Sequence, residues 1–193
     1  MTSHPQVAQQ RGVTMLEALI TVVILAFGIL GLANLQAKMQ NAEVESYARS
    51  QALVLLDDMA ARVSANRANA AAYVALAATG TEAGTGDTQP TDCSGVAFGA
   101  ARDVCEWSNG LKGRAELDAS AIAVGAMIGG RGCIDDLGLV PPSYRITVAW
   151  QGLSTTVAPQ AGLDCAQGLY GGNDAYRRVV TKIVSVANLA PGP

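Results

Sequence analysis

Few side chains in this sequence have the types and spacing that catalysis or metal binding requires. The 193-residue chain contains a single histidine, His4, so nearly all of it lacks an imidazole that could act as a general base or a metal ligand. Two acidic pairs, Asp57-Asp58 and Asp135-Asp136, are adjacent in the sequence. Adjacent residues on a helix or a strand do not face each other, so we expect neither shared acid–base work nor a calcium site from these pairs.

No other motif indicates an enzyme or a cofactor. The GGRG stretch at 129–132 is better interpreted as a strand interrupted by glycines than as a phosphate-binding loop, and the chain has no nucleophile elbow. The formal net charge is −3 and lysines and arginines form no run, which argues against a nucleic-acid partner. We therefore expect a protein without catalytic activity, metal or cofactor.

The cysteines are the remaining candidates for chemistry. There are four, Cys93, Cys105, Cys133 and Cys165, and none belongs to a C-x-x-C pair. All lie beyond the apolar N-terminal run, a pattern typical of two disulfides formed in an oxidising compartment. Four cysteines allow three connectivities, and the sequence does not choose among them.

The apolar run at 13–35 is the first predicted element of the chain, and its length indicates a membrane-spanning helix. As a helix it would extend about 34 Å, enough to cross the ~30 Å hydrocarbon core of a membrane. It is too long for a signal peptide, and no clean A-x-A cleavage site follows it. A signal anchor explains the length, and Arg11 weakly favours a cytoplasmic N-terminus. Neither interpretation explains Glu17, because a charge at membrane depth costs at least ~2.5 kcal/mol.

The stretch RGVTMLE, which contains Glu17, resembles the class III leader of type IV pilins. In that family prepilin peptidase removes a polar leader after a glycine, the new N-terminal residue is methylated, and a glutamate stands fifth after the cut. The resemblance implies a leader at 1–12, cleavage between Gly12 and Val13, and N-methylation of Val13, although Val13 replaces the usual phenylalanine. It also implies that Glu17 pairs with the N-terminal amine of a neighbouring subunit during assembly, since a paired carboxylate is tolerable in lipid.

A single long helix is predicted from 13 to 69, because no proline occurs between Pro5 and Pro90. Residues 13–35 are its transmembrane half, in which Gly28 and Gly31 provide either flexibility or close packing contacts. Residues 36–69 are its amphipathic, periplasmic half. From the end of the transmembrane half onward, apolar residues recur near helical spacing: Leu35, Met39, Ala42, Ala52, Leu56, Met59 and Val63. The pairs Glu45–Arg49 and Asp58–Arg62 have the acid-first i,i+4 order and are predicted to be solvated surface pairs.

The stretch YARSQALVLLDDMAARVSANR in this helix resembles the PilV-type minor pilins, the type IV pilus modification proteins, through its RSQA, DMA and ANR segments. The resemblance implies a structural subunit in pilus assembly or initiation, at or near the tip. Its implied partners are other major and minor pilins, the inner-membrane assembly platform, prepilin peptidase and the lipid bilayer. The implied location is the inner membrane of a Gram-negative-type bacterium, with a periplasmic head, and then the extracellular pilus.

Two alternatives stay open. The chain could be a minor pseudopilin of a type II secretion system, which shares the leader but usually lacks the ANR ending. It could instead be a signal-anchored periplasmic binding domain that never polymerises, which would keep its leader and be indifferent to loss of Glu17.

The globular head is predicted at 70–193. ATGTEAGTGDTQP is a predicted loop, and ARDVCEWSNGLKGRAEL contains a short helix with Trp107 and Leu111 on one face. Strands are predicted in GAMIGGRGCID, SYRITVAWQG and YRRVVTKIVSVANL. The fold class is therefore α+β, and the resemblance completes it as a type IV pilin fold with three or four antiparallel strands packed on the long helix. We expect the pairs Cys93–Cys105 and Cys133–Cys165, the second of which resembles the loop-pinning disulfide near the C-terminus of many pilins.

Overall fold

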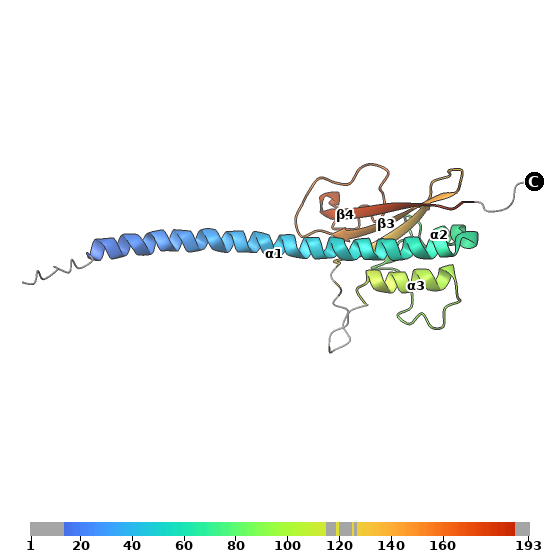
Figure 1. The fold of residues 1–193 in the computed structure, drawn as a ribbon, viewed down its shortest axis with the longest axis horizontal. Helices are drawn as coiled ribbons and strands as arrows, with labels where there is room; N and C mark the ends of the chain where they lie inside the picture. The colour runs from blue at the N-terminus through green and yellow to red at the C-terminus, as the bar shows by residue number, and fades with distance from the viewer. Residues whose placement is uncertain (1–13, 115–118, 120–124, 126, 188–193) are drawn as a thin grey trace, which may run out of the picture. The chain divides into compact units, whose positions relative to one another are not determined.

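The protein has an α+β fold whose elements are drawn in Figure 1. The computed structural model describes residues 14–114, 119, 125 and 127–187. The chain divides into two compact units, Met1–Ala42 and Glu43–Pro193, and we call the second unit the head. The elements in chain order are α1 (Met15–Ala65), η1 (Arg67–Asn69), α2 (Ala70–Ala77), β1 (Ala83–Gly84), α3 (Ala100–Leu111), β2 (Arg131–Asp136), β3 (Ser143–Gln151), η2 (Asp174–Tyr176) and β4 (Arg177–Ser185).

The long helix α1 ends at Ala65 rather than near residue 69, where the sequence placed its end. Asn66 has φ −101° and ψ 39°, outside helical geometry. Its side chain is committed to a local turn, because Asn66 Nδ2 donates to the Tyr73 hydroxyl at 3.2 Å and Oδ1 accepts from Asn69 Nδ2 at 3.0 Å. Side chains of asparagine that bond locally compete with the helical backbone in this way.

The main core of the head lies between three helices and one face of the sheet. On α1 it includes Ala52, Leu56, Met59 and Val63, the apolar positions predicted from the helical spacing. The predicted helix in the head is confirmed as α3, whose Trp107 and Leu111 belong to the same core, and Figure 1 shows α3 running beside α1 there. Leu35, Met39 and Ala42, predicted on the same stripe, are exposed and belong to the first unit.

The sheet is antiparallel with the order β1-β2-β3-β4, and it includes all three predicted strands. Ile134 in β2 lies opposite Ile146 in β3, which lies opposite Lys182 in β4. The alternation predicted for β3 is confirmed, because its residues Tyr144, Ile146, Val148 and Trp150 all lie in the main core.

The other face of the sheet is also covered, which the alternation of β3 did not predict. A second cluster there joins Cys133 of β2 and Ala149 of β3 to Cys165, Ala166 and Tyr170. The last three belong to the long segment between β3 and β4, which contains little regular structure. Small residues on this face therefore let a loop pack where solvent would otherwise lie.

Two elements and one ion pair differ from the sequence-based expectations. The two-residue strand β1 lies within the stretch ATGTEAGTGDTQP that was predicted to be a loop, and helix α2 lies just before that stretch, where no element was predicted. Glu45 does not pair with Arg49: its Oε1 lies 3.3 Å from Arg178 Nη2 in β4, and it accepts the Leu153 backbone N–H at 2.9 Å. The prediction of a Glu45–Arg49 pair was wrong because a tertiary partner was within reach.

Candidate functional site

The described part of the first unit is a helical surface that is apolar and exposed. Its most apolar window has a mean hydropathy of 2.5, and 0% of that window is buried within the protein. Between Glu17 and Lys38 no residue is charged. By length and composition this stretch of α1 can cross a membrane, and a signal sequence near an N-terminus passes the same test.

Glu17 lies in the first turn of α1, three positions after Thr14. The Thr14 hydroxyl accepts the Glu17 backbone N–H at 3.3 Å, and the Thr14 carbonyl oxygen accepts the Ala18 N–H at 3.2 Å. Thr-x-x-Glu is the capping-box spacing, so Thr14 begins the helix by satisfying a backbone donor that would otherwise be free. Within the described residues, which begin at Thr14, no hydrogen bond or ion pair to the Glu17 carboxylate is seen.

The other residues assigned to processing are only partly visible. Gly12 and Val13, the expected cleavage and methylation positions, lie outside the described residues. Gly28 and Gly31 lie within α1, which continues through both. A Cβ added at either position would meet nothing within 4 Å, so both face open space on the helix surface.

The four cysteines form the two disulfides that we expected. Cys93 pairs with Cys105, which fastens the loop before α3 to that helix, with a Cα–Cα distance of 6.0 Å. Cys133 pairs with Cys165, which fastens the β3–β4 segment to β2, with a Cα–Cα distance of 5.8 Å. The second bridge lies in the small cluster on the far face of the sheet, and it holds the irregular segment there.

Arg62 joins α1 to α3 through a cluster of carboxylates. Its guanidinium lies 3.0 Å from Asp58, 3.1 Å from Asp103 and 2.7 Å from Glu106. The predicted Asp58–Arg62 pair is therefore present, but it belongs to a tertiary network rather than to a solvated helix surface alone. The Tyr73 hydroxyl donates to Asp103, and burial together with this bond raises the pKa of Tyr73 to about 12.

Within each of the two adjacent acidic pairs, the two side chains bond to different partners. Asp57 pairs with Lys182 at 2.8 Å while Asp58 pairs with Arg62. Asp135 accepts two bonds from Thr79 at 3.0 Å, and Asp136 accepts the Gly138 N–H at 2.8 Å. In the part of the chain that the structure describes, no group of three or more His, Cys, Asp or Glu side chains could hold a metal ion.

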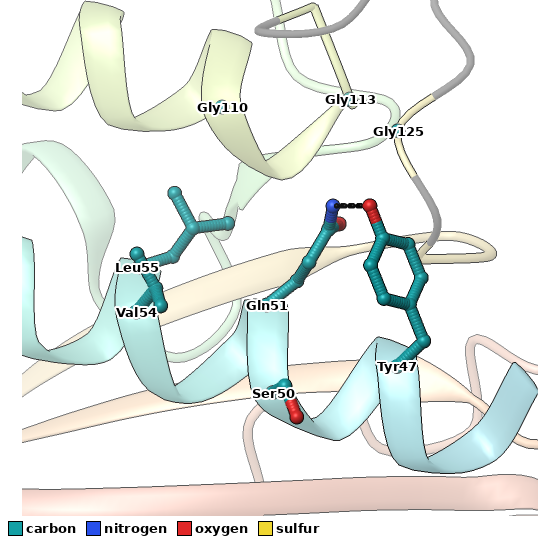
Figure 2. Close-up of a pocket in the computed structure, with 8 residues that line it drawn as sticks. All are labelled: Tyr47, Ser50, Gln51, Val54, Leu55, Gly110, Gly113 and Gly125. Carbon is teal, nitrogen blue, oxygen red and sulfur yellow. Dashed lines mark hydrogen bonds between the residues drawn. The ribbon is translucent and has the colours of Figure 1, made fainter. Parts of the chain in front are cut away.

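An apolar hollow of about 370 Å³ lies beside α1 in the head (Figure 2). Tyr47, Gln51, Val54 and Leu55 of α1 line it, with Gly110 and Gly113 opposite. Gln51 Nε2 donates to the Tyr47 hydroxyl at 3.0 Å, the bond drawn in Figure 2. This hollow could not be predicted from the sequence, because it depends on where the end of α3 meets α1.

Sequence reasoning also missed two smaller features. The Thr14 cap had a readable signal, since Thr-x-x-Glu precedes an apolar run in the sequence. The second feature is a polar hollow near the loop at 80–89, which involves Arg131 of β2. Its signal is weak, because Arg131 is separated from that loop by α3 in the chain.

Comparison of the chain with known protein families, curated proteins and solved structures finds no match.

Proposed function

We propose that this chain is a minor pilin of the PilV type, a structural subunit that takes part in the assembly of a type IV pilus. The observation that carries the proposal is the placement of Glu17. A carboxylate stands in the first turn of an exposed apolar helix, and no described residue of the same chain pairs with it. In lipid an unpaired carboxylate is costly, and we assign its partner to a neighbouring subunit.

The leader motif supplies that partner. Cleavage between Gly12 and Val13 would create a positively charged amine close to Glu17 in the sequence. In an assembly of parallel helices, the amine of one subunit can meet the Glu17 carboxylate of the next. An unpaired Glu17 is costly in lipid. The alignment of neighbouring helices that pairs the carboxylate with the amine is therefore favoured over other alignments.

The packing of the head on α1 and its two disulfides also support the proposal. Its sheet packs on the second half of α1, so the same helix belongs to both the apolar unit and the folded core. Two disulfides suit an oxidising compartment such as the periplasm. The proposed subunit is therefore stored in the inner membrane with its head in the periplasm, and it contributes packing surfaces rather than catalysis.

The experiment is a Glu17→Ala substitution in the native host. Wild-type protein should appear in both the membrane and the sheared pilus fraction. The variant should reach the membrane at the wild-type level, while its amount in the pilus fraction should fall about tenfold or more, since the amine loses its partner in lipid. Quantitative immunoblots of the two fractions provide the measurement.

Glu43→Ala is the matched control. It removes an exposed carboxylate from the same helix, outside the apolar run, and should leave both fractions unchanged. If Glu17→Ala enters pili as efficiently as the wild type, the pairing proposal is wrong. If the wild type never enters the pilus fraction, the chain is not a pilus subunit.

A further inference from the structure

A polar hollow of about 320 Å³ lies in the head at the loop between α2 and α3. Glu82, Asp87, Thr88 and Gln89 of this loop line it, together with Arg131 at the start of β2. Thr88 is exposed, so the hollow opens to solvent. Its volume lies within the range of small-molecule sites.

Arg131 supplies the positive charge among the residues that line the hollow. Among the described residues no carboxylate forms an ion pair with Arg131, and its Nε is buried without a hydrogen-bond partner. The guanidinium lies against Gly86 of the loop: an added Cβ there would be 3.3 Å from Arg131 Nη2 and 3.4 Å from Nη1. Gly86 also has φ +91°, a backbone conformation that favours glycine. The lack of a side chain at this position lets the loop lie close to the guanidinium.

The two carboxylates that line the hollow are already used by other groups. Asp87 Oδ2 accepts from the Gly84 N–H at 2.8 Å and from Ser108 Oγ at 2.6 Å, and Oδ1 accepts from Lys112 Nζ and from the Gln89 N–H at 3.1 Å. Burial opposes ionisation of Asp87, but the bonds from Lys112 and Ser108 outweigh it and lower its pKa. Lys112 therefore balances the charge of Asp87, and Asp87 is not available to Arg131.

Only one of the two carboxylate oxygens of Glu82 accepts hydrogen bonds from described residues. Its Oε1 accepts the Gly80 N–H at 3.0 Å and the Ala166 N–H at 3.3 Å. No described residue bonds to its Oε2, and none bonds to the side chains of Thr88 or Gln89. The hollow thus combines one planar cation with a carboxylate oxygen, a hydroxyl and an amide that are free to bond.

We propose that this hollow binds the carboxylate of an acidic sugar, such as a uronic acid residue. A guanidinium holds a carboxylate through two parallel hydrogen bonds. Sugar hydroxyls can donate to Glu82 Oε2 and bond with Thr88 and Gln89. The charge of Glu82 disfavours a dianion such as phosphate more strongly than a monoanion, and the mainly polar lining favours hydroxyl groups over an apolar peptide side chain. The inference stands whether or not the chain assembles into pili.

Binding is tested with the full chain in detergent micelles at pH 7, by saturation-transfer NMR titration with sodium glucuronate. The uncharged methyl ester of glucuronate is the matched ligand, because it differs only at the carboxylate. We expect glucuronate to bind at least about tenfold more tightly than the ester, the range expected for bonds to a charged group. Equal affinity for the two, or no binding of glucuronate, overturns the proposal.

Arg131→Gln should reduce glucuronate affinity about tenfold or more. Arg49→Gln is the control: it removes an exposed arginine of α1 and should leave affinity within twofold. If Arg131→Gln binds as the wild type does, the proposal fails. Should that variant not fold, the ester comparison on the wild type still decides. Tighter binding of inorganic phosphate, or of a short peptide with a free C-terminus, would contradict the assignment to acidic sugars.

Discussion

Acidic side chains in this protein have two roles: pairing within the chain and, in the proposed function, contacts outside the chain. Asp87 belongs to the first kind, since four donors surround its carboxylate. The proposed function assigns Glu17 to the second, and the described residues offer its carboxylate no partner. We therefore expect different effects from the two substitutions: loss of Asp87 should affect the folding of the head, and under the proposed function loss of Glu17 should affect assembly.

Asp87→Asn is expected to lower the free energy of unfolding of the head by about 2 kcal/mol at pH 7, the range for hydrogen bonds to a charged group. The pKa of Asp87 in the folded protein lies below its ordinary value of 3.8. The contribution of the carboxylate is therefore complete above that value and disappears as the pH falls through the lowered pKa. Urea unfolding of the full chain in detergent, followed by tryptophan fluorescence, measures this difference between pH 7 and pH 2.

Asp57→Asn is the control for this prediction. Asp57 pairs with Lys182, but the two side chains are 66% and 49% exposed, so the change in unfolding free energy should be below about 0.5 kcal/mol. A difference between wild type and Asp87→Asn that does not shrink with falling pH would contradict the assigned role of the charge.

At the scale of elements, α3 and β2 are held at a close approach. Trp107 of α3 lies over Gly132 of β2, and Trp107 Nε1 donates to the Leu55 carbonyl oxygen of α1 at 2.9 Å. The indole is therefore fixed from both sides: a hydrogen bond to one helix and van der Waals contact with the sheet. Glycine at position 132 makes this three-element contact possible.

Gly132→Ala should destabilise the head by about 3 kcal/mol, because its Cβ would lie 2.2 Å from Trp107 Cη2. Gly95→Ala should change the unfolding free energy little, since a Cβ there meets nothing within 4 Å. Near-ultraviolet circular dichroism of the tryptophans, combined with urea unfolding, checks both. A Gly132→Ala variant with wild-type stability would mean that α3 can shift without cost.

Periodicity in the sequence was enough to predict the elements with a two-sided pattern. It located α3, β3 and the buried stripe of α1 in the head, whereas β4 was predicted from its β-branched residues and β2 from a segment interrupted by glycines. It missed α2, whose sequence AAAYVALA is apolar on all sides and has no period to recognise. It also missed β1, because a two-residue strand leaves no pattern.

Tertiary contacts could be predicted only where the sequence itself indicates which residues pair. The disulfide pairs were expected partly from resemblance, since spacing alone allows three connectivities. Glu45 could not be matched to Arg178 from spacing, because the two residues are far apart in the chain. The hollow at Arg131 required the fold, since α3 separates its lining residues in sequence.

At the scale of the whole molecule, one helix belongs to two different environments. The first unit contains an apolar surface and no described disulfide, whereas the head buries its part of α1 and carries both bridges. The stability of the head should therefore depend on its disulfides, and the apolar unit should respond to the membrane or to neighbouring helices.

Removing the Cys133–Cys165 bridge should cost more stability than removing Cys93–Cys105. The sequence separations are 32 and 12 residues, for which the chain-entropy estimate gives about 4 and about 3 kcal/mol. Urea unfolding of the two double Cys→Ala variants, compared with the oxidised wild type, provides the test. A larger loss for the shorter loop would show that native packing, not loop entropy, sets the order.

The proposed function requires that the chain be processed and assembled as a pilin. The intact mass and the N-terminal peptide of the protein, purified from its native membrane without and with reductant, test it most directly. We expect a chain that begins at Val13 with one added methyl group and that gains the hydrogens of two disulfides on reduction. A chain that retains residues 1–12 would contradict it and favour an anchored domain that does not polymerise, and a cut beyond the apolar run would remove the role of Glu17.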